Sequence, residues 1–395
     1  MPELADVFLR RGADRRLRAG HLWVYSNEVD GERNALTRFG AGDAVRVRAS
    51  NGALLGSAYL EPNNLICGRL YAPGREAAFA DGLPEALARA LAGRELAFDQ
   101  PFYRLVYGDS DLLPGVVVDR FGDYLVIQLN NAGIERYESA LVATLVALLS
   151  PAGILLRCDS RARREQGLED RVAVVHGKMP EQLALEENGV RFEAPAQAGQ
   201  KTGWFYDHRL SRARLAAYVA GREVLDIYSY IGGWGIQAAA FGARSVCCLD
   251  SSATALEGVA ANARLNGLED RVETLRGNAA QTMAALAAQG RCFGMVILDP
   301  PAFIQRRRDI KKGIKAYQRI NELGLRLLEP GGVLVSASCS MHLARADLVA
   351  AVQAAAVRSG RQVRLLEQGA QGPDHPVHPA IPETDYLKAL FFRVM

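Results

Sequence analysis

The sequence lacks the features that define membrane, secreted and metal-binding proteins. No uncharged apolar run is long enough to cross a bilayer, because the run over residues 140–149 is about half of the roughly 20 residues required. The first six residues include two acids and no apolar run, which argues against a signal peptide. The six cysteines include no C-x-x-C pair, so neither a zinc site nor a disulfide framework is indicated. We therefore expect a cytoplasmic protein with no membrane association, no metal and reduced thiols, most of them buried in the core.

Net charge is also scarce, at +3 for 395 residues. This balance excludes a uniformly basic surface, so any nucleic-acid partner must be bound by local patches. One such patch is an arginine cluster that is followed by aromatic residues, comprising Arg10, Arg11, Arg15, Arg16, Arg18, Trp23 and Tyr25. Cations beside aromatic rings suit RNA phosphates and bases, although a solvated basic helix face would explain the same pattern.

The hydrophobic content of 49% predicts packed domains, and three regions differ in pattern. Residues 1–75 contain short apolar runs separated by glycines, which predicts a small β-rich module. Residues 76–187 mix short apolar runs with the helical segments 84–92 and 137–149, which predicts a small α+β domain. In residues 188–395, strands and helices alternate from Glu223 onward, which predicts an α/β domain with a parallel, doubly wound sheet.

The predicted strands of this third region locate its binding site. They are the segments 223–228, 245–250, 271–275, 294–299 and 332–338. Right-handed crossovers place the carboxyl ends of parallel strands on one edge of the sheet, and ligands bind at that edge.

The first of these strands contains an acid and leads into a glycine-rich turn. Asp226 lies inside the strand, which runs on through Tyr228 and Ser229 to a turn with Gly232 and Gly235. Glycines allow the backbone to approach a ligand closely. A mere strand-to-helix turn would use the same residues, so the glycines alone are weak evidence.

Polar residues at the ends of the next two strands strengthen the interpretation. Asp250 ends the second strand, where a carboxylate can accept both hydroxyls of a ribose, and Asn278 follows the third, where an amide can bond an adenine edge. A dinucleotide-binding site is the main alternative, but the first glycine of G-x-G-x-x-G is missing. The carboxylate of Asp226 would repel a pyrophosphate and would suit the positive charges of S-adenosylmethionine. We therefore expect S-adenosylmethionine as the cofactor.

The last two predicted strands end in residues that suit nucleobase chemistry. Asp299 and Pro300 begin a rigid loop that includes Phe303, so a carboxylate and a stacking ring could face a base. Cys339 follows the fifth strand, and a thiolate there could add to carbon 6 of a pyrimidine and activate carbon 5. The alternatives are a simple turn for the loop and a buried core position for the cysteine.

Together these segments resemble the RlmI-like family of bacterial large-subunit (23S) ribosomal RNA 5-methylcytosine methyltransferases, over nearly the whole chain. The segments that carry the resemblance are 9–12, 21–25, 41–43, 107–120, 199–209, 229–233, 299–303, 338–340 and 374–376. The resemblance implies an N-terminal PUA-like RNA-binding domain, a central α+β domain and a class I Rossmann-like methyltransferase domain. It also implies S-adenosylmethionine as the cofactor and large-subunit ribosomal RNA as the partner, and it does not decide between a monomer and a homodimer.

The resemblance further implies roles for individual residues. Cys339 would be the nucleophile, and Asp299 would serve both catalysis and the cofactor. Asp207 and Arg209 would join Asp226, Tyr228, Ser229, Gly232, Gly235, Asp250 and Asn278 around the cofactor. RNA would contact Arg10, Arg11, Trp23, Pro300, Phe303 and His375. The acceptor of the carbon-5 proton stays open among Asp299, Asp374 and His375, because Pro301 stands where many such enzymes carry a second cysteine.

Two other functions remain as alternatives. The Asp-Pro-Pro-Ala-Phe loop also resembles the loop of methyltransferases that act on exocyclic amines of adenine or guanine, which need no cysteine. A non-catalytic RNA-binding protein of ribosome assembly could use the same scaffold, since a fold does not imply an activity.

Overall fold

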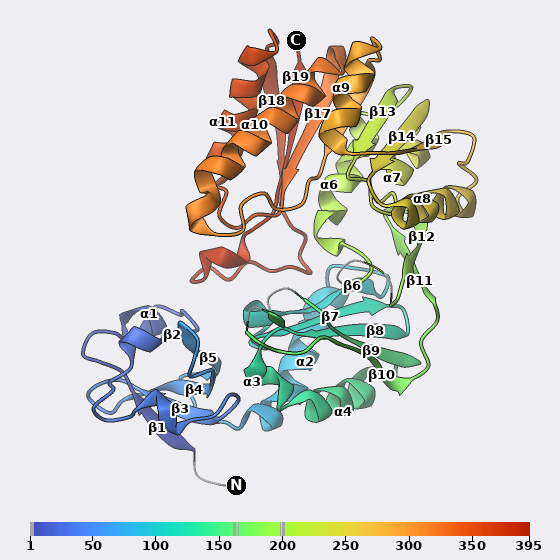
Figure 1. Ribbon diagram of the computed structural model, residues 1–395. Coiled ribbons are helices and arrows are strands. Elements are labelled where there is room, and N and C mark those ends of the chain that lie inside the picture. The colour runs from blue at the N-terminus through green and yellow to red at the C-terminus, as the bar shows by residue number, and fades with distance from the viewer. Residues whose placement is uncertain (1–3, 161–162, 165, 198, 200–201) are drawn as a thin grey trace. The chain divides into compact units, whose positions relative to one another are not determined.

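The computed structural model describes residues 4–160, 163–164, 166–197, 199 and 202–395 (Figure 1). The chain divides into two compact units, and each unit collects three segments. The N-terminal unit comprises Met1–Leu183, Pro195–Trp204 and Pro373–Thr384. The C-terminal unit comprises Ala184–Ala194, Phe205–Gly372 and Asp385–Met395.

The first sheet of the N-terminal unit has five strands in the order β1-β3-β4-β5-β2, as the β-rich pattern predicted. Its strands are β1 (Ala5–Phe8), β2 (Trp23–Tyr25), β3 (Ala44–Arg48), β4 (Leu54–Leu60) and β5 (Ile66–Pro73), and a short helix, α1 (Arg15–Arg18), precedes β2. Strand β3 alternates strictly, so Val45 and Val47 are buried in the core while Arg46 and Arg48 point outward to Asp6.

A second five-stranded sheet of the same unit has the order β10-β9-β8-β7-β6. Its strands are β6 (Phe102–Tyr107), β7 (Val116–Phe121), β8 (Tyr124–Leu129), β9 (Gly153–Cys158) and β10 (Arg171–Gly177). The helices of this part are α2 (Phe79–Glu95), α3 (Ala132–Glu135) and α4 (Glu138–Leu149). A hairpin turn joins β7 to β8, with Gly122 at φ +63°.

Helix α2 begins five residues before the predicted segment 84–92. Pro84 suggested a helix start, but the helix already begins at Phe79. Tertiary packing explains the difference, because the buried Phe79 ring packs edge-on against Tyr59 and Tyr71 and at a tilt against Tyr137.

The C-terminal unit contains a seven-stranded sheet with the order β15-β14-β13-β16-β17-β19-β18. Its strands are β13 (Glu223–Ile227), β14 (Ser245–Asp250), β15 (Val272–Arg276), β16 (Phe293–Leu298), β17 (Leu328–Ser338), β18 (Val363–Gly369) and β19 (Lys388–Val394). The alternation of strands and helices is confirmed, but the wholly parallel sheet is not. Strand β19 is antiparallel to both β17 and β18, because the segment that joins β18 to β19 holds only a short 3₁₀ helix, Pro382–Thr384, and no crossover α-helix.

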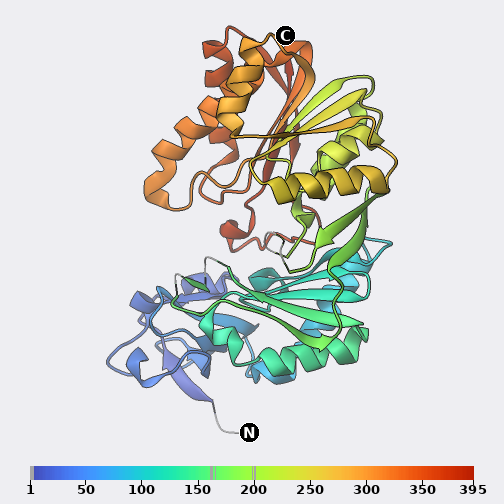
Figure 2. The same cartoon turned by 45° about the vertical axis from the view of Figure 1, so that its right-hand side comes forward.

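Helices cover both faces of this sheet (Figures 1 and 2). They are α6 (Arg209–Ala213), α7 (Gly235–Ala240), α8 (Ala253–Leu265), α9 (Ala279–Ala288), α10 (Ile310–Arg326) and α11 (Arg345–Arg358). Leu225 and Ile227 of β13 join the core cluster that α9, α10 and α11 contribute to, whereas Asp226 points to the opposite face, toward the start of α7. This alternation places the Asp226 carboxylate beneath the glycine-rich turn.

The hairpin of β11 (Gln182–Glu187) and β12 (Val190–Pro195) forms the remaining sheet. Asn188 and Gly189 turn it with φ values of +55° and +77°, as a type I′ turn requires.

Candidate functional site

The turn between β13 and α7 has a constrained backbone. Tyr228 and Tyr230 adopt positive φ values of +66° and +50°, and Gly232 has +90°. Positive φ is costly for residues other than glycine and persists where surrounding structure enforces it, often at binding sites. A Cβ atom on Gly235 would lie 2.5 Å from Cys248 Sγ and 3.0 Å from Asp226 Oδ2, so only glycine fits at this close approach.

Asp226 is fully buried beneath this turn. Its Oδ2 accepts a hydrogen bond from the Gly235 N–H at 2.9 Å, while Oδ1 has no hydrogen-bond partner among the residues that the structure describes. Burial, opposed by the Gly235 bond and reinforced by Asp299 and Asp250, raises the pKa of Asp226 to about 8. A buried acid with an unsatisfied oxygen is expected where a cation binds.

Asp250 lies at the carboxyl end of β14 and is only partly buried. Its Oδ2 accepts the Tyr230 N–H at 3.0 Å and its Oδ1 accepts the Ser252 N–H at 2.9 Å. These bonds fix the carboxylate and leave each oxygen a lone pair for a ribose hydroxyl. Asn278 uses one lone pair of its Oδ1 to cap α9 through the Gln281 N–H at 3.2 Å, which leaves its Nδ2 and a second Oδ1 lone pair to serve an adenine.

These residues fit S-adenosylmethionine. The unsatisfied carboxylate oxygen of Asp226 suits its positive charge, and the fixed Asp250 carboxylate suits its ribose. The hydroxyl of Ser229 is also buried with no hydrogen-bond partner in the described part of the chain, so a polar ligand group could bond it.

Asp299 follows β16, and its carboxylate contacts the side chains of Trp234 and His208, for which the sequence predicted no role. Its Oδ2 accepts the Trp234 Nε1–H at 3.0 Å, and its Oδ1 lies 3.2 Å from His208 Nε2. Burial alone would raise the pKa of Asp299, but the His208 charge and the bonds from His208 and Trp234 leave it below the ordinary value. For His208, burial would lower the pKa, but Asp299 and Asp207 leave it raised. His208 belongs to the segment that carried the resemblance, although no role was assigned to it.

Cys339 lies at the carboxyl end of β17, the strand next to β16. Leu298 pairs in register with Ser336, so Asp299 and Cys339 follow neighbouring parallel strands. Both residues lie near enough to Tyr317 for their charges to act on its hydroxyl, whose pKa is raised to about 12 chiefly by burial. The thiol is partly exposed, whereas Cys67, Cys158, Cys247 and Cys248 are buried and Cys292 is exposed. The site therefore combines a carboxylate and an accessible thiol.

Asp207 and Arg209 are both engaged inside the C-terminal unit. Asp207 Oδ2 accepts the Tyr386 hydroxyl at 2.5 Å. Arg209 is 8% exposed, and its Nε lies 3.6 Å from Oε2 of the fully buried Glu187. Their role toward the cofactor stays a prediction. Gln200 and Lys201 of the same predicted segment lie outside the described residues.

The loop after Asp299 presents an aromatic ring and positive charge. Pro300 is buried, and the partly exposed Phe303 packs 4.8 Å from the Tyr317 ring, measured between centroids. A run of exposed basic residues follows and leads into α10; we call Arg306, Arg307, Arg308, Lys311, Lys312 and Lys315 the α10 basic stretch.

His375 and Asp374 belong to the N-terminal unit rather than to the unit of Cys339. Asp374 is fully buried and its Oδ2 accepts the Arg104 N–H at 3.1 Å. His375 is 1% exposed, with Nδ1 3.0 Å from Asp374 Oδ1 and its ring 5.2 Å from that of Tyr107. The structure thus gives both residues local partners, and their predicted roles stay predictions.

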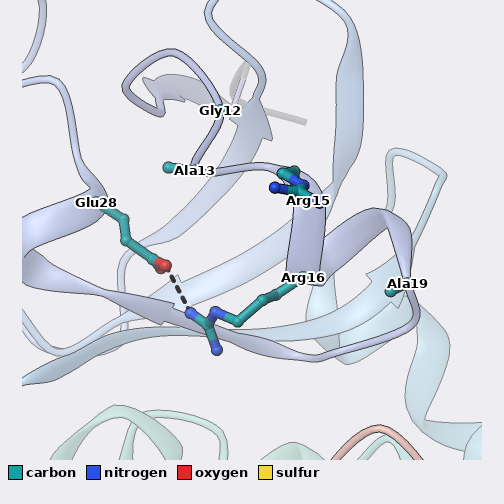
Figure 3. Close-up of a pocket in the computed structure, with 6 residues that line it drawn as sticks. All are labelled: Gly12, Ala13, Arg15, Arg16, Ala19 and Glu28. Atoms are coloured by element: carbon teal, nitrogen blue, oxygen red, sulfur yellow. Dashed lines mark hydrogen bonds and ion pairs between the residues drawn. The ribbon is translucent and has the colours of Figure 1, made fainter.

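Two residues of the arginine cluster, Arg15 and Arg16, line an open pocket of about 430 Å³ beside α1, together with Glu28 (Figure 3). Arg16 is bonded to Glu28 at 2.7 Å and lies over the Tyr25 ring at 4.5 Å. Arg15 is exposed beside the same pocket and pairs with no carboxylate in the described part of the chain.

The two predicted RNA contacts next to this cluster have partners of their own. Arg10 is exposed, and its Nε donates to the Val29 carbonyl at 3.1 Å. Trp23 is partly buried beneath the Arg69 guanidinium, which lies 5.4 Å from the ring centroid. Arg11 is exposed.

Among the residues that the structure describes, no group of three or more His, Cys, Asp or Glu side chains could hold a metal ion. None of the helices that the structure describes has the length and apolar character needed to cross a membrane.

Comparison with known proteins yields two family matches. A family model of S-adenosylmethionine-dependent methyltransferases matches residues 137–393, and a model of PUA-like domains matches residues 7–73. The second match coincides with the sheet of β1 to β5.

Full-length relatives and solved structures agree with these matches. The chain is 36% identical to ribosomal RNA large subunit methyltransferase I of Shewanella denitrificans, over 98% of this chain and 99% of the relative. It is 34% identical to the protein of that name from Aliivibrio fischeri, over 99% of both chains. A candidate S-adenosylmethionine-dependent methyltransferase from Streptococcus mutans has the same fold, with a TM-score of 0.84, 20% identity and coverage of 99% and 100%. A candidate methyltransferase solved in complex with SAH gives a TM-score of 0.85 at 19% identity, with the same coverage.

Proposed function

Because the chain belongs to the S-adenosylmethionine-dependent methyltransferases, in the family of ribosomal RNA large subunit methyltransferase I, we propose that it methylates carbon 5 of a cytosine in large-subunit ribosomal RNA. The names of the full-length relatives support the RNA substrate, and this substrate supports a cytoplasmic location. The carbon-5 assignment rests on one observation, the partly exposed Cys339 at the strand end next to Asp299.

The thiol is needed because carbon 5 of cytosine is a poor nucleophile. The Cys339 thiol first loses its proton, and its sulfur then bonds to carbon 6 of the ring, which makes carbon 5 enamine-like. S-adenosylmethionine supplies the methyl group to carbon 5. Removal of the carbon-5 proton then lets the bond between sulfur and carbon 6 break, and Cys339 leaves as a thiolate.

We propose Asp299 as the residue that accepts the carbon-5 proton. It belongs to the same unit as Cys339. Its lowered pKa keeps it ionised and able to accept a proton, and His208 Nε2 lies 3.2 Å from it to stabilise the charge. Its place at the strand end beside Cys339 puts it on the edge where the base must bind.

The cofactor contacts that we propose follow the described geometry. Asp250 would accept the ribose hydroxyls, Asp226 and Ser229 would bond the methionine end, and Asn278 Nδ2 would donate to the adenine. The turn that contains Tyr228, Gly232 and Gly235 would surround the cofactor. Asp207 and Arg209 would be further cofactor contacts.

The RNA contacts that we propose lie on both units. The Phe303 ring would stack on the target base beside Pro300, and the α10 basic stretch would bind phosphates. In the PUA-like domain, Arg10, Arg11 and Trp23 would contact RNA, and His375 is carried over from the resemblance alone.

Replacing the thiol tests the proposal. Cys339→Ala should bind S-adenosylmethionine as the wild type does and should transfer no methyl group to RNA. Cys292→Ala, at the exposed cysteine, is the matched control and should keep full turnover. Near-full turnover of Cys339→Ala would favour exocyclic-amine methylation instead, and a wild-type chain without cofactor binding would favour the non-catalytic alternative.

A further inference from the structure

A buried lysine supports the loop that carries Cys339. Lys388 is the first residue of β19 and pairs in register with Ser338, the residue before Cys339. It is 5% exposed. Its Nζ donates to the carbonyl oxygens of Ser340 at 2.6 Å and of Leu343 at 2.8 Å. The ammonium group therefore links the backbone at Ser340 to the backbone at Leu343, on the carboxyl side of Cys339.

The charge of this lysine is only partly compensated. Within the described part of the chain, no carboxylate lies within ion-pair distance of Nζ, and two carbonyl dipoles are its hydrogen-bond acceptors. Burial, opposed by Asp385 and reinforced by Arg345, lowers the pKa of Lys388 to about 8, and a negative charge on Cys339 acts in the opposite direction. A buried ammonium that lacks a counter-ion gains stability when a nearby thiol ionises.

We propose that Lys388 is a positioning residue that fixes the Cys339 loop and stabilises the Cys339 thiolate. The inference rests on the proposed function, in which Cys339 is the nucleophile. The thiol proton leaves to water, and at pH 7, below its pKa of about 8, Lys388 stays mostly protonated. Its charge faces the thiolate before attack and again after the bond between sulfur and carbon 6 breaks.

The neighbouring charges agree with this role. Two further titratable groups lie near this region, Tyr317 and Asp299, and Tyr317 donates to or accepts from Ser338 Oγ at 2.7 Å. A tyrosine whose pKa is raised to about 12 stays neutral at neutral pH, and Asp299 is already paired with His208. Arg345 adds a second positive charge near Lys388, but its Nη1 donates to the Gly369 carbonyl at 2.9 Å. Among the residues that the structure describes, Lys388 is therefore the cation whose hydrogen bonds reach the Cys339 loop.

The rate at which iodoacetamide alkylates Cys339, measured between pH 6 and pH 10 on the full chain without RNA, tests the inference. Mass spectrometry of the Cys339 peptide gives the rate, and the exposed Cys292 provides an internal control in the same sample. In the wild type, the apparent pKa of the thiol should lie below the ordinary value of about 8.5. Lys388→Met should raise it by about one unit and slow alkylation at pH 7 by up to about tenfold, without affecting Cys292.

Lys388→Arg should restore most of the rate because it retains the charge. Superimposable pH profiles for the wild type and a folded Lys388→Met would overturn the proposal. If Lys388→Met does not fold, the wild-type profile decides alone, since an apparent thiol pKa at or above about 8.5 contradicts the proposal. Alkylation of Cys339 does not depend on methyl transfer, so this experiment can fail while the proposed function stands. The proposed function would be overturned by a different result, turnover in Cys339→Ala.

Discussion

His208 Nε2 lies 3.2 Å from Asp299 Oδ1, and each of the two side chains favours the charged form of the other. The pKa of His208 is raised although burial would lower it, and the pKa of Asp299 is lowered although burial would raise it. Trp234 donates to the second oxygen of Asp299 and packs its ring 5.2 Å from that of His208. The three residues come from separate segments and together fix the carboxylate beside the Cys339 strand.

This ion pair should make stability depend on pH. Since the pKa of His208 is raised above 6.5 in the folded state, its contribution is fully present below pH 6.5 and is lost as pH rises through the folded pKa. Asp299 is ionised throughout that range. His208→Gln should therefore show a smaller fall in Tm than the wild type as pH rises above 6.5, in thermal unfolding without cofactor. A difference in Tm between the two proteins that is constant with pH would contradict the ion pair.

Cofactor binding should release a proton from Asp226. With a pKa of about 8, most copies of this buried carboxyl are protonated at pH 7, and the positive charge of S-adenosylmethionine should lower that pKa. Below pH 8, affinity should fall by up to about tenfold per pH unit as the solution becomes more acidic. Calorimetry in buffers of different ionisation enthalpy should detect the released proton at pH 7 in the wild type and none in Asp226→Asn. Equal proton release in both proteins would assign the proton to another group.

RNA binding should depend on the α10 basic stretch. Replacing Lys311 and Lys312 with Gln should weaken RNA binding and lower the slope of log affinity against log salt by about 0.7 for each lost phosphate contact. The matched control replaces Arg326 and Arg358 with Gln, which removes the same charge from residues already paired with Glu322. An unchanged slope in the Lys311 and Lys312 variant would leave a solvated helix start as the interpretation of this stretch.

The sequence predicted the elements whose signal is local. Strands β13, β14 and β16 are short, mainly apolar runs between helical segments, and Asp226, Gly235 and Asp250 could be assigned because their positions relative to those strands define the site. Four of the six cysteines are buried, as expected from their residue type, and the cysteine at the strand end is one of the two exceptions.

The interactions that the sequence did not predict join residues far apart in the chain. His208 and Asp299 are 91 positions apart, and no local pattern brings them together. Strand β19 was not predicted, and it pairs antiparallel with β17, a strand that ends 50 positions before β19 begins. Lys388 gained its significance only when the register of β17 and β19 placed it opposite Ser338.

The central claim is a covalent bond between Cys339 and carbon 6 of the target cytosine. Fluorine in place of the carbon-5 hydrogen prevents the final proton removal, so the adduct should accumulate on ribosomal RNA that carries 5-fluorocytosine. The target base must leave its stack to reach the thiol, so the RNA should be long enough to contain the folded target region. We expect a complex that resists denaturation, requires S-adenosylmethionine, forms with the wild type and Cys292→Ala, and is absent with Cys339→Ala. Methyl transfer by the wild type to unmodified RNA, without any denaturation-resistant complex on the fluorinated RNA, would contradict carbon-5 methylation through Cys339.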